Sequence, residues 1–154
     1  MRYLALGLLL AASATNATTL EIAVTQGRSE PQRFSYNLSS DRQTLDLRDS
    51  HRYTAALKDV ARKKEICREA EYRTGMLMTL REVEKVSDTQ FKIEIIGQTS
   101  TLKSLAKGDQ LSCGLNQIPD IENRAFSDTS VLEMDRTKAV VVDGKTTLLL
   151  TIKP

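Results

Sequence analysis

The two cysteines carry the clearest chemistry in this sequence. Cys67 and Cys113 are the only cysteines, and an even number in an oxidising compartment predicts a disulfide. A bridge would close a loop of about 47 residues and stabilise the fold by about 4 kcal/mol on the chain-entropy model. A reactive thiol would want a Cys-x-x-Cys pair or a nearby histidine, and His51 is the only histidine. The cysteines therefore predict a structural crosslink.

Acidic pairs are the other candidates for catalysis. Glu69 with Glu71, and Glu82 with Glu84, are two residues apart, so each pair would share one face of a strand. Glycoside hydrolysis by such carboxylates also needs a cleft with sugar-stacking aromatics, but the chain has no Trp and 5% aromatic residues. No Gly-x-Ser-x-Gly, phosphate-loop or EF-hand spacing is present. These observations predict a protein that is not an enzyme and has no metal or cofactor.

The first residues predict export. Arg2 is followed by an apolar run at residues 3–12 and by small polar residues at 13–17, which is the pattern of a signal peptide. Residues 18–154 would then form a single domain in the periplasm or outside the cell. The apolar run is too short to span a bilayer, so no membrane span is expected once the signal is removed.

The charge balance argues against nucleic acid as a partner. The chain has 22 Lys and Arg against 20 Asp and Glu, a formal net charge of +2. Basic residues are densest in one stretch, which predicts either a solvated face or a contact for an acidic partner or an anionic lipid surface. The candidate contact residues there are Arg52, Lys58, Arg62 and Lys63.

Alternating apolar residues predict strands over most of the chain. An Asp143-Gly144 pair between two β-rich runs predicts a type I′ hairpin. The expected strands are 19–25, 33–38, 43–48, 76–81, 91–96, 139–142 and 145–152.

One segment follows the period of a helix instead. Tyr53, Ala56, Leu57, Val60 and Ala61 are three or four residues apart, which predicts a helix over residues 51–65 with the basic residues on its polar side. Residues 97–130 are rich in Gly, Ser, Thr, Asn and Asp and are expected to be mostly loop. The predicted fold is mainly β, a sandwich or small barrel of about seven or eight strands, with one α-helix and one disulfide.

Two stretches resemble the C-terminal module of secretins, the ring channels of type II and type III secretion and of type IV pili. Residues 74–80 and 91–95 are similar to its Gly-led strand and the alternating strand that follows. Residues 118–124, which begin with Ile118 and Pro119 and end with Arg124, are similar to its Pro-x-Ile-x-x-Arg segment, and residues 147–154 resemble its closing apolar strand. The likeness spans about residues 74–154. It implies an accessory or secretin-like component of a secretion or pilus system, with contact residues at 118–124.

Export, one crosslink and the missing catalytic patterns predict a protein that acts through contacts with a protein of the cell envelope, with homo-oligomerisation as a further possibility. A different class fits the same features. In that alternative the chain is a secreted or periplasmic inhibitor or ligand-binding module, and a disulfide-tethered loop at residues 106–128 inserts into the cleft of its partner.

Overall fold

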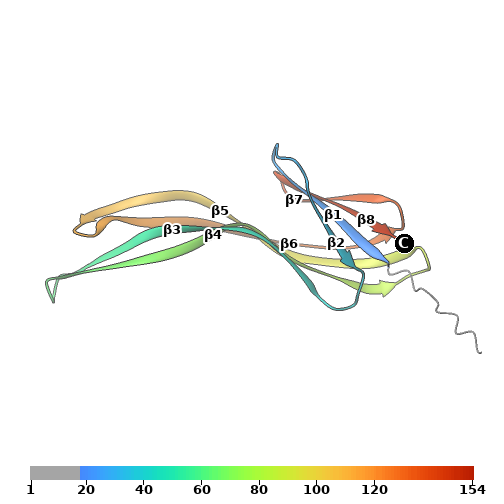
Figure 1. The fold of residues 1–154 in the computed structure, drawn as a ribbon, viewed down its shortest axis with the longest axis horizontal. Helices are drawn as coiled ribbons and strands as arrows, with labels where there is room; N and C mark the ends of the chain where they lie inside the picture. The colour runs from blue at the N-terminus through green and yellow to red at the C-terminus, as the bar shows by residue number, and fades with distance from the viewer. Residues whose placement is uncertain (1–17) are drawn as a thin grey trace, which may run out of the picture.

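Two antiparallel four-stranded sheets make up the part of the protein that the structure describes. The computed structural model describes residues 18–154, and the predicted signal peptide at 1–17 lies outside the described residues. One sheet has the order β2-β1-β8-β7 and the other β3-β4-β5-β6 (Figure 1). The strands are β1 Thr19–Gln26, β2 Gln32–Asn37, β3 Gln43–Asp59, β4 Lys64–Lys85, β5 Gln90–Leu111, β6 Gly114–Glu133, β7 Thr137–Asp143 and β8 Thr146–Lys153.

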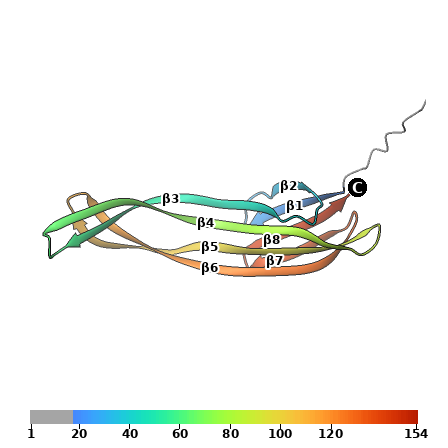
Figure 2. The ribbon, with the colours of Figure 1, turned by 90° about the horizontal axis from the view of Figure 1, so that it is seen from below.

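The two sheets differ greatly in length. Strands β3 to β6 have 17 to 22 residues, whereas β1, β2, β7 and β8 have 6 to 8. At about 3.3 Å per residue a strand of the long sheet reaches roughly 55–75 Å, and one of the short sheet roughly 20–27 Å. The short sheet therefore covers only one end of the long sheet, here called the sandwich. The rest of the long sheet projects beyond it as an arm (Figures 1 and 2).

The hydrophobic core lies between the sheets in the sandwich. Alternate residues of β1 and β8 point inward and meet alternate residues of β4 and β5, as period-two burial requires. Only the halves of β4 and β5 that the short sheet covers contribute. The core residues are Leu20, Ile22, Val24, Leu45, Met76, Met78, Leu80, Phe91, Ile93, Ile95, Leu132, Leu148, Leu150 and Ile152.

The predicted fold class, mainly β with one helix, is wrong because the described residues contain no helix. Residues 51–65 are the end of β3, a turn and the start of β4. Tyr53, Ala55 and Leu57 alternate along β3, as a strand requires. The spacing of Tyr53, Ala56 and Leu57 fits a helix equally well. Pairing decided the outcome, since the ladder between β3 and β4 runs unbroken from Gln43 to Asp59. The sandwich architecture and the single disulfide agree with the prediction.

The prediction that residues 97–130 form mostly loop is also wrong. These residues form most of β5 and β6, which pair with each other along almost their whole length. Gly97 lies within β5, and glycine is needed there because the ring of Phe126 occupies the space that a Cβ would take. Pro119 is accommodated in β6 because β6 is an edge strand, where a missing N–H can face outward. In the arm both faces of β5 and β6 are largely open to solvent, so these residues lack the apolar alternation that would have predicted strands.

The seven predicted strands are confirmed, but the final hairpin turns one residue later than expected. Asp143 pairs with Thr146, so the loop is Gly144-Lys145. Neither Asp143 nor Gly144 has a positive φ, which excludes the type I′ turn. Instead, Asp143 Oδ1 accepts hydrogen bonds from the backbone N–H groups of Lys145 at 3.1 Å and Thr146 at 2.7 Å. The side chain of Asp143 therefore holds this turn.

We expect Asp143→Ala to lower the free energy of unfolding by about 1 kcal/mol, because it removes both side-chain hydrogen bonds in the turn and keeps the backbone bond from Lys145 to Asp143. Gly144→Ala is the matched control. No atom lies within 4 Å of the position its Cβ would take, so its effect should stay within about 0.5 kcal/mol. Urea unfolding of the two variants measures both values. A larger loss for Gly144→Ala than for Asp143→Ala would contradict this assignment of the turn.

Candidate interaction surface on the arm

The arm consists of two β-ribbons that separate from each other. Pairing between β4 and β5 stops at Gly75 and Ser100. Beyond that point β4 pairs only with β3, and β5 only with β6. We call residues 49–74 the first finger and residues 101–122 the second finger. The fingers twist across each other and run side by side to the free end of the arm (Figures 1 and 2).

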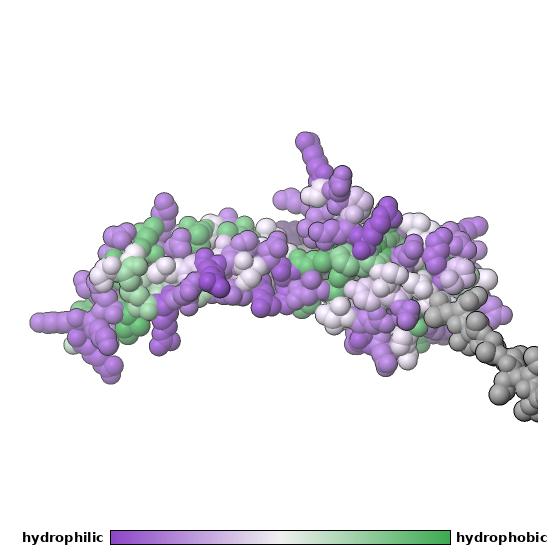
Figure 3. Space-filling model, in the orientation of Figure 1, coloured by the Kyte–Doolittle hydropathy of each residue, from purple (hydrophilic) through white to green (hydrophobic). Residues whose placement is uncertain are grey.

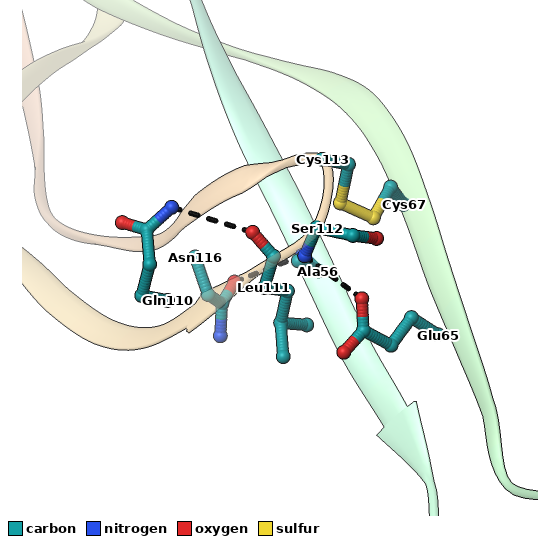
Figure 4. The surroundings of a disulfide bond; sticks show 8 residues. All are labelled: Ala56, Glu65, Cys67, Gln110, Leu111, Ser112, Cys113 and Asn116. Atoms are coloured by element: carbon teal, nitrogen blue, oxygen red, sulfur yellow. Dashed lines mark hydrogen bonds between the residues drawn. A yellow bond between two sulfur atoms is a disulfide. The ribbon is translucent and has the colours of Figure 1, made fainter.

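A disulfide and a carboxylate join the ends of the fingers (Figure 4). Cys67 of β4 is bonded to Cys113 in the turn between β5 and β6, which confirms the predicted crosslink. Glu65 Oε2 accepts a hydrogen bond of 2.8 Å from the backbone N–H of Ser112. Hydrogen bonds from Ser112 hold the pKa of Glu65 below its ordinary value, and Lys58 adds a weaker attraction. We call this set of contacts the clasp.

Replacing Cys67 by serine should lower the free energy of unfolding by about 4 kcal/mol, the chain-entropy value for a loop of this length. Thermal unfolding with and without reductant measures the effect in the native protein. The Cys67→Ser/Cys113→Ser double variant serves as the control, since its midpoint should not respond to reductant. Equal midpoints for the oxidised and reduced native protein would show that the crosslink does not stabilise the fold.

The facing edges of the fingers meet along β3 and β6. Within the described residues this seam has no backbone pairing; side chains bridge it instead. The backbone N–H of Ala56 donates to Asn116 Oδ1 at 2.9 Å (Figure 4), and that of Thr54 donates to Gln117 Oε1 at 3.3 Å. A sheet would satisfy these N–H groups with carbonyls of a neighbouring strand. Two side-chain amides take that role here.

An apolar groove with a volume of about 580 Å³ runs along the seam. Its walls combine the two fingers, and two of its apolar side chains are largely open to solvent: Leu57 is 65% exposed and Ile118 is 55% exposed. Figure 3 shows apolar surface close to the free end of the arm, beside hydrophilic side chains. The lining residues include Tyr53, Ala55, Leu57, Ile66, Ile118 and Pro119. This groove is the candidate interaction surface.

The basic residues predicted to form a helix face lie at two places in the first finger. Lys58 is the next-to-last residue of β3, beside the turn that holds Arg62 and Lys63. Together with Lys64 they place four cations around Val60, which is 79% exposed. Arg52 lies nearer the sandwich, where its Nη1 is 3.5 Å from a carboxylate oxygen of Glu69.

The residues predicted from the secretin likeness are also divided. Ile118 and Pro119 line the groove opposite β3. Arg124 lies at the base of the arm, where its Nη2 is 3.1 Å from a carboxylate oxygen of Glu122. The arm therefore brings Ile118 and Pro119 close to the first finger but leaves Arg124 apart from them.

Sequence reasoning missed the wall of the groove that the first finger forms and the residues that bridge the seam. The sequence pattern predicts a helix at Leu57 and a loop at Asn116 and Gln117. The alternation of Tyr53, Ala55 and Leu57 is a signal that could have indicated a strand face. No pattern in the sequence marks the amides of Asn116 and Gln117, because their role depends on β3 lying opposite them.

The remaining candidates for chemistry are engaged in structural contacts. His51 Nε2 is 2.8 Å from Thr74 Oγ1, and its ring stacks on Tyr72 with 5.0 Å between centroids. Among residues 18–154 no three His, Cys, Asp or Glu side chains gather as metal ligands would. The same residues include no helix long and apolar enough to cross a membrane.

Comparisons with family models, with curated proteins and with solved structures give no match for this chain. The secretin likeness therefore stays a prediction from its motifs alone.

Proposed function

We propose that this chain is an exported, non-enzymatic binding protein that uses its arm to contact a protein partner in the cell envelope. The observation that carries the proposal is the solvent-open apolar groove between two fingers that a disulfide holds together. Apolar surface of this kind is unfavourable in water and commonly marks a site of interaction. We further propose an accessory or secretin-like role in a secretion or pilus system.

The construction of the arm supports this proposal. A segment beyond the core gains little free energy from hydrophobic burial. That gain does not offset the conformational entropy that is lost when the segment is ordered. Leu111, which is 9% exposed, is the one apolar side chain of the described fingers that counts as buried. The clasp keeps the arm ordered and so preorganises its surface for binding. A rigid arm is useful to a protein that must reach a partner.

The crosslink also bears on the compartment. A disulfide is consistent with an extracytoplasmic protein, because cytosolic thiols are usually kept reduced. We propose the periplasm or the exterior as the working location. The competing inhibitor model relied on a loop at residues 106–128, and those residues belong to paired strands apart from the turn that holds Cys113.

Site-specific photocrosslinking tests the proposed function. Benzoylphenylalanine is placed at Ile118 in the groove of the mature protein, which is then irradiated in envelope extract from the producing cells. We expect a discrete crosslinked product that Leu57→Asp abolishes, because a charge in the groove disfavours apolar contact. Mass spectrometry identifies the second chain and shows whether it is another copy of this one.

The control carries the same probe at Val141, which is 69% exposed on β7 of the sandwich. A product of equal yield from both positions, or no product from position 118, would overturn the assignment of the arm as the contact surface. Circular dichroism of each variant checks that the strands are retained.

A further inference from the structure

We propose that the seam between β3 and β6 accepts an extended, acidic segment of the partner protein, which pairs with β3 in place of Asn116 and Gln117. This inference rests on the proposed function, since it specifies how the arm would bind. It names both the conformation and the charge of the bound segment. The argument depends on the edges of the two fingers, the amides that bridge them, the groove and the cations at the tip.

The two edge strands of the long sheet are β3 and β6, so each has one side without a strand partner. In the arm these two open sides face each other. The N–H groups of Thr54 and Ala56 are two residues apart and both point across the seam. Donors at this spacing are what an added strand pairs with in an antiparallel or parallel ladder.

The bridging amides resemble the carbonyls of such a strand. Asn116 Oδ1 and Gln117 Oε1 are amide oxygens, chemically close to a backbone carbonyl oxygen. A bound segment that displaces them exchanges one N–H to amide hydrogen bond for another of the same kind. The displaced side chains are half-buried and can turn toward water, where their own polar groups are satisfied. Displacement therefore leaves no donor of β3 unpaired.

The groove supplies the side-chain half of this recognition. Tyr53, Ala55 and Leu57 alternate along β3 and line one wall, while Ile118 and Pro119 line the other. A strand added at the seam would direct every second side chain into this groove. Apolar residues at alternate positions of the bound segment would then cover Leu57 and Ile118, the two most exposed apolar side chains of the lining.

The cations at the tip select the charge of the segment. Lys58, Arg62, Lys63 and Lys64 surround the turn of the first finger, and Asp59 is the only acidic residue within that stretch. Asp59 lies 3.8 Å from Arg62 and Lys58 is attracted to Glu65, which leaves Lys63 and Lys64 to attract a partner. An acidic end on the bound segment complements this surface and speeds association at low salt.

The crosslink ties the second finger to β4 and not to the edge strand β3. Cys67 lies on β4 and pairs with Ala56 of β3, so the bonded cysteine is one strand away from the seam. Separation of β3 from β6 at this level breaks the side-chain bridges to Thr54 and Ala56, and among the described residues no backbone ladder joins β3 to β6. The disulfide meanwhile keeps the ends of the fingers together while a segment enters.

Peptide selection on the intact mature protein tests the inference. A display library of random peptides is selected for binding, and the enriched peptides are synthesised and measured by fluorescence anisotropy. We expect apolar residues at alternate positions, acidic residues at one end, and affinity that falls as salt rises. N-methylation of the peptide backbone at alternate residues should weaken binding about tenfold, since it removes pairing hydrogen bonds without altering side chains.

Substitutions in the protein test the role of the seam independently of changes to the peptide. Asn116→Ala/Gln117→Ala should bind the peptides several-fold more tightly, because the competing amides are gone. Gln110→Ala is the matched control, because the amide of Gln110 also lies on the second finger but donates to the backbone oxygen of Leu111. Hydrogen exchange should show the amides of Thr54 and Ala56 more protected with peptide than without it in the double variant.

The outcomes separate this inference from the proposed function. Peptides that require Leu57 and Ile118 but tolerate N-methylation at every position would overturn strand addition and leave the arm as a binding surface. Unchanged affinity in the Asn116→Ala/Gln117→Ala variant would do the same. Enrichment of basic peptides would overturn the acidic partner. A selection that yields no binder sensitive to Leu57→Asp would overturn both proposals.

Discussion

Replacing Leu150 by alanine is expected to lower the free energy of unfolding by about 2–5 kcal/mol, the range for removing a fully buried leucine. Leu150 is 0% exposed and lies in the centre of β8, between β1 and β7 in the short sheet. Its loss leaves a cavity in the layer where the two sheets meet. Because the rest of the long sheet lies outside this layer, the sandwich carries nearly all the hydrophobic stabilisation of the protein.

Leu149→Ala is the matched control for this prediction. Leu149 is the preceding residue of the same strand, points to the opposite face and is 37% exposed. Its replacement should cost about 1 kcal/mol or less, since little new cavity forms at a surface. Urea unfolding followed by circular dichroism measures both variants. Comparable losses for the two leucines would mean that the core does not lie between the two sheets as described.

The second large effect is expected at Gly75, where the fingers begin. Its φ is +120°, a conformation that side chains with a Cβ rarely adopt, and a Cβ there would collide with the backbone oxygen of Leu47. The Cα of Arg48 is also only 3.0 Å from that position. Gly75→Ala must therefore move backbone atoms of β3, and we expect it to cost about 3 kcal/mol or more.

Gly114 separates the two causes of this loss. Its φ is +128°, close to that of Gly75, but no atom lies within 4 Å of its Cβ position. Gly114→Ala should therefore show only the conformational cost, about 1–2 kcal/mol. Thermal and urea unfolding of both variants give the difference, which measures the collision with β3. If Gly114→Ala is as harmful as Gly75→Ala, crowding at the base of the fingers is not the cause.

The strands of the sandwich could be predicted because each buries one face. Leu20, Ile22 and Val24 of β1 alternate with less apolar neighbours, and this pattern follows directly from burial on one side only. The same reasoning failed in the arm. There Tyr53, Ala55 and Leu57 lie on one face of β3 and Ala56 on the other, so residues on both faces of the strand are small or apolar.

Only some residues of the candidate site could be predicted from the sequence. The basic residues Lys58, Arg62 and Lys63 were identified as a cluster, and they do gather at one end of the arm, but on a turn between strands and not on a helix. Ile118 was identified through a motif and lies in the groove. The opposite wall was not foreseen, since Leu57 and Ile118 are 61 positions apart and only the crossing of the fingers brings them together.

The sequence by itself determined the disulfide, the strands of the sandwich and the absence of recognisable catalytic motifs, because these depend on residue type and on short-range alternation. Only the tertiary structure decided that β3 to β6 continue past the core, that they part at Gly75 and that side-chain amides bridge β3 and β6. The physical reason is that these features arise from pairing between distant segments. A ribbon outside the core has no buried face, so its strands are specified by the partners they pair with and not by the hydrophobic pattern of each strand alone.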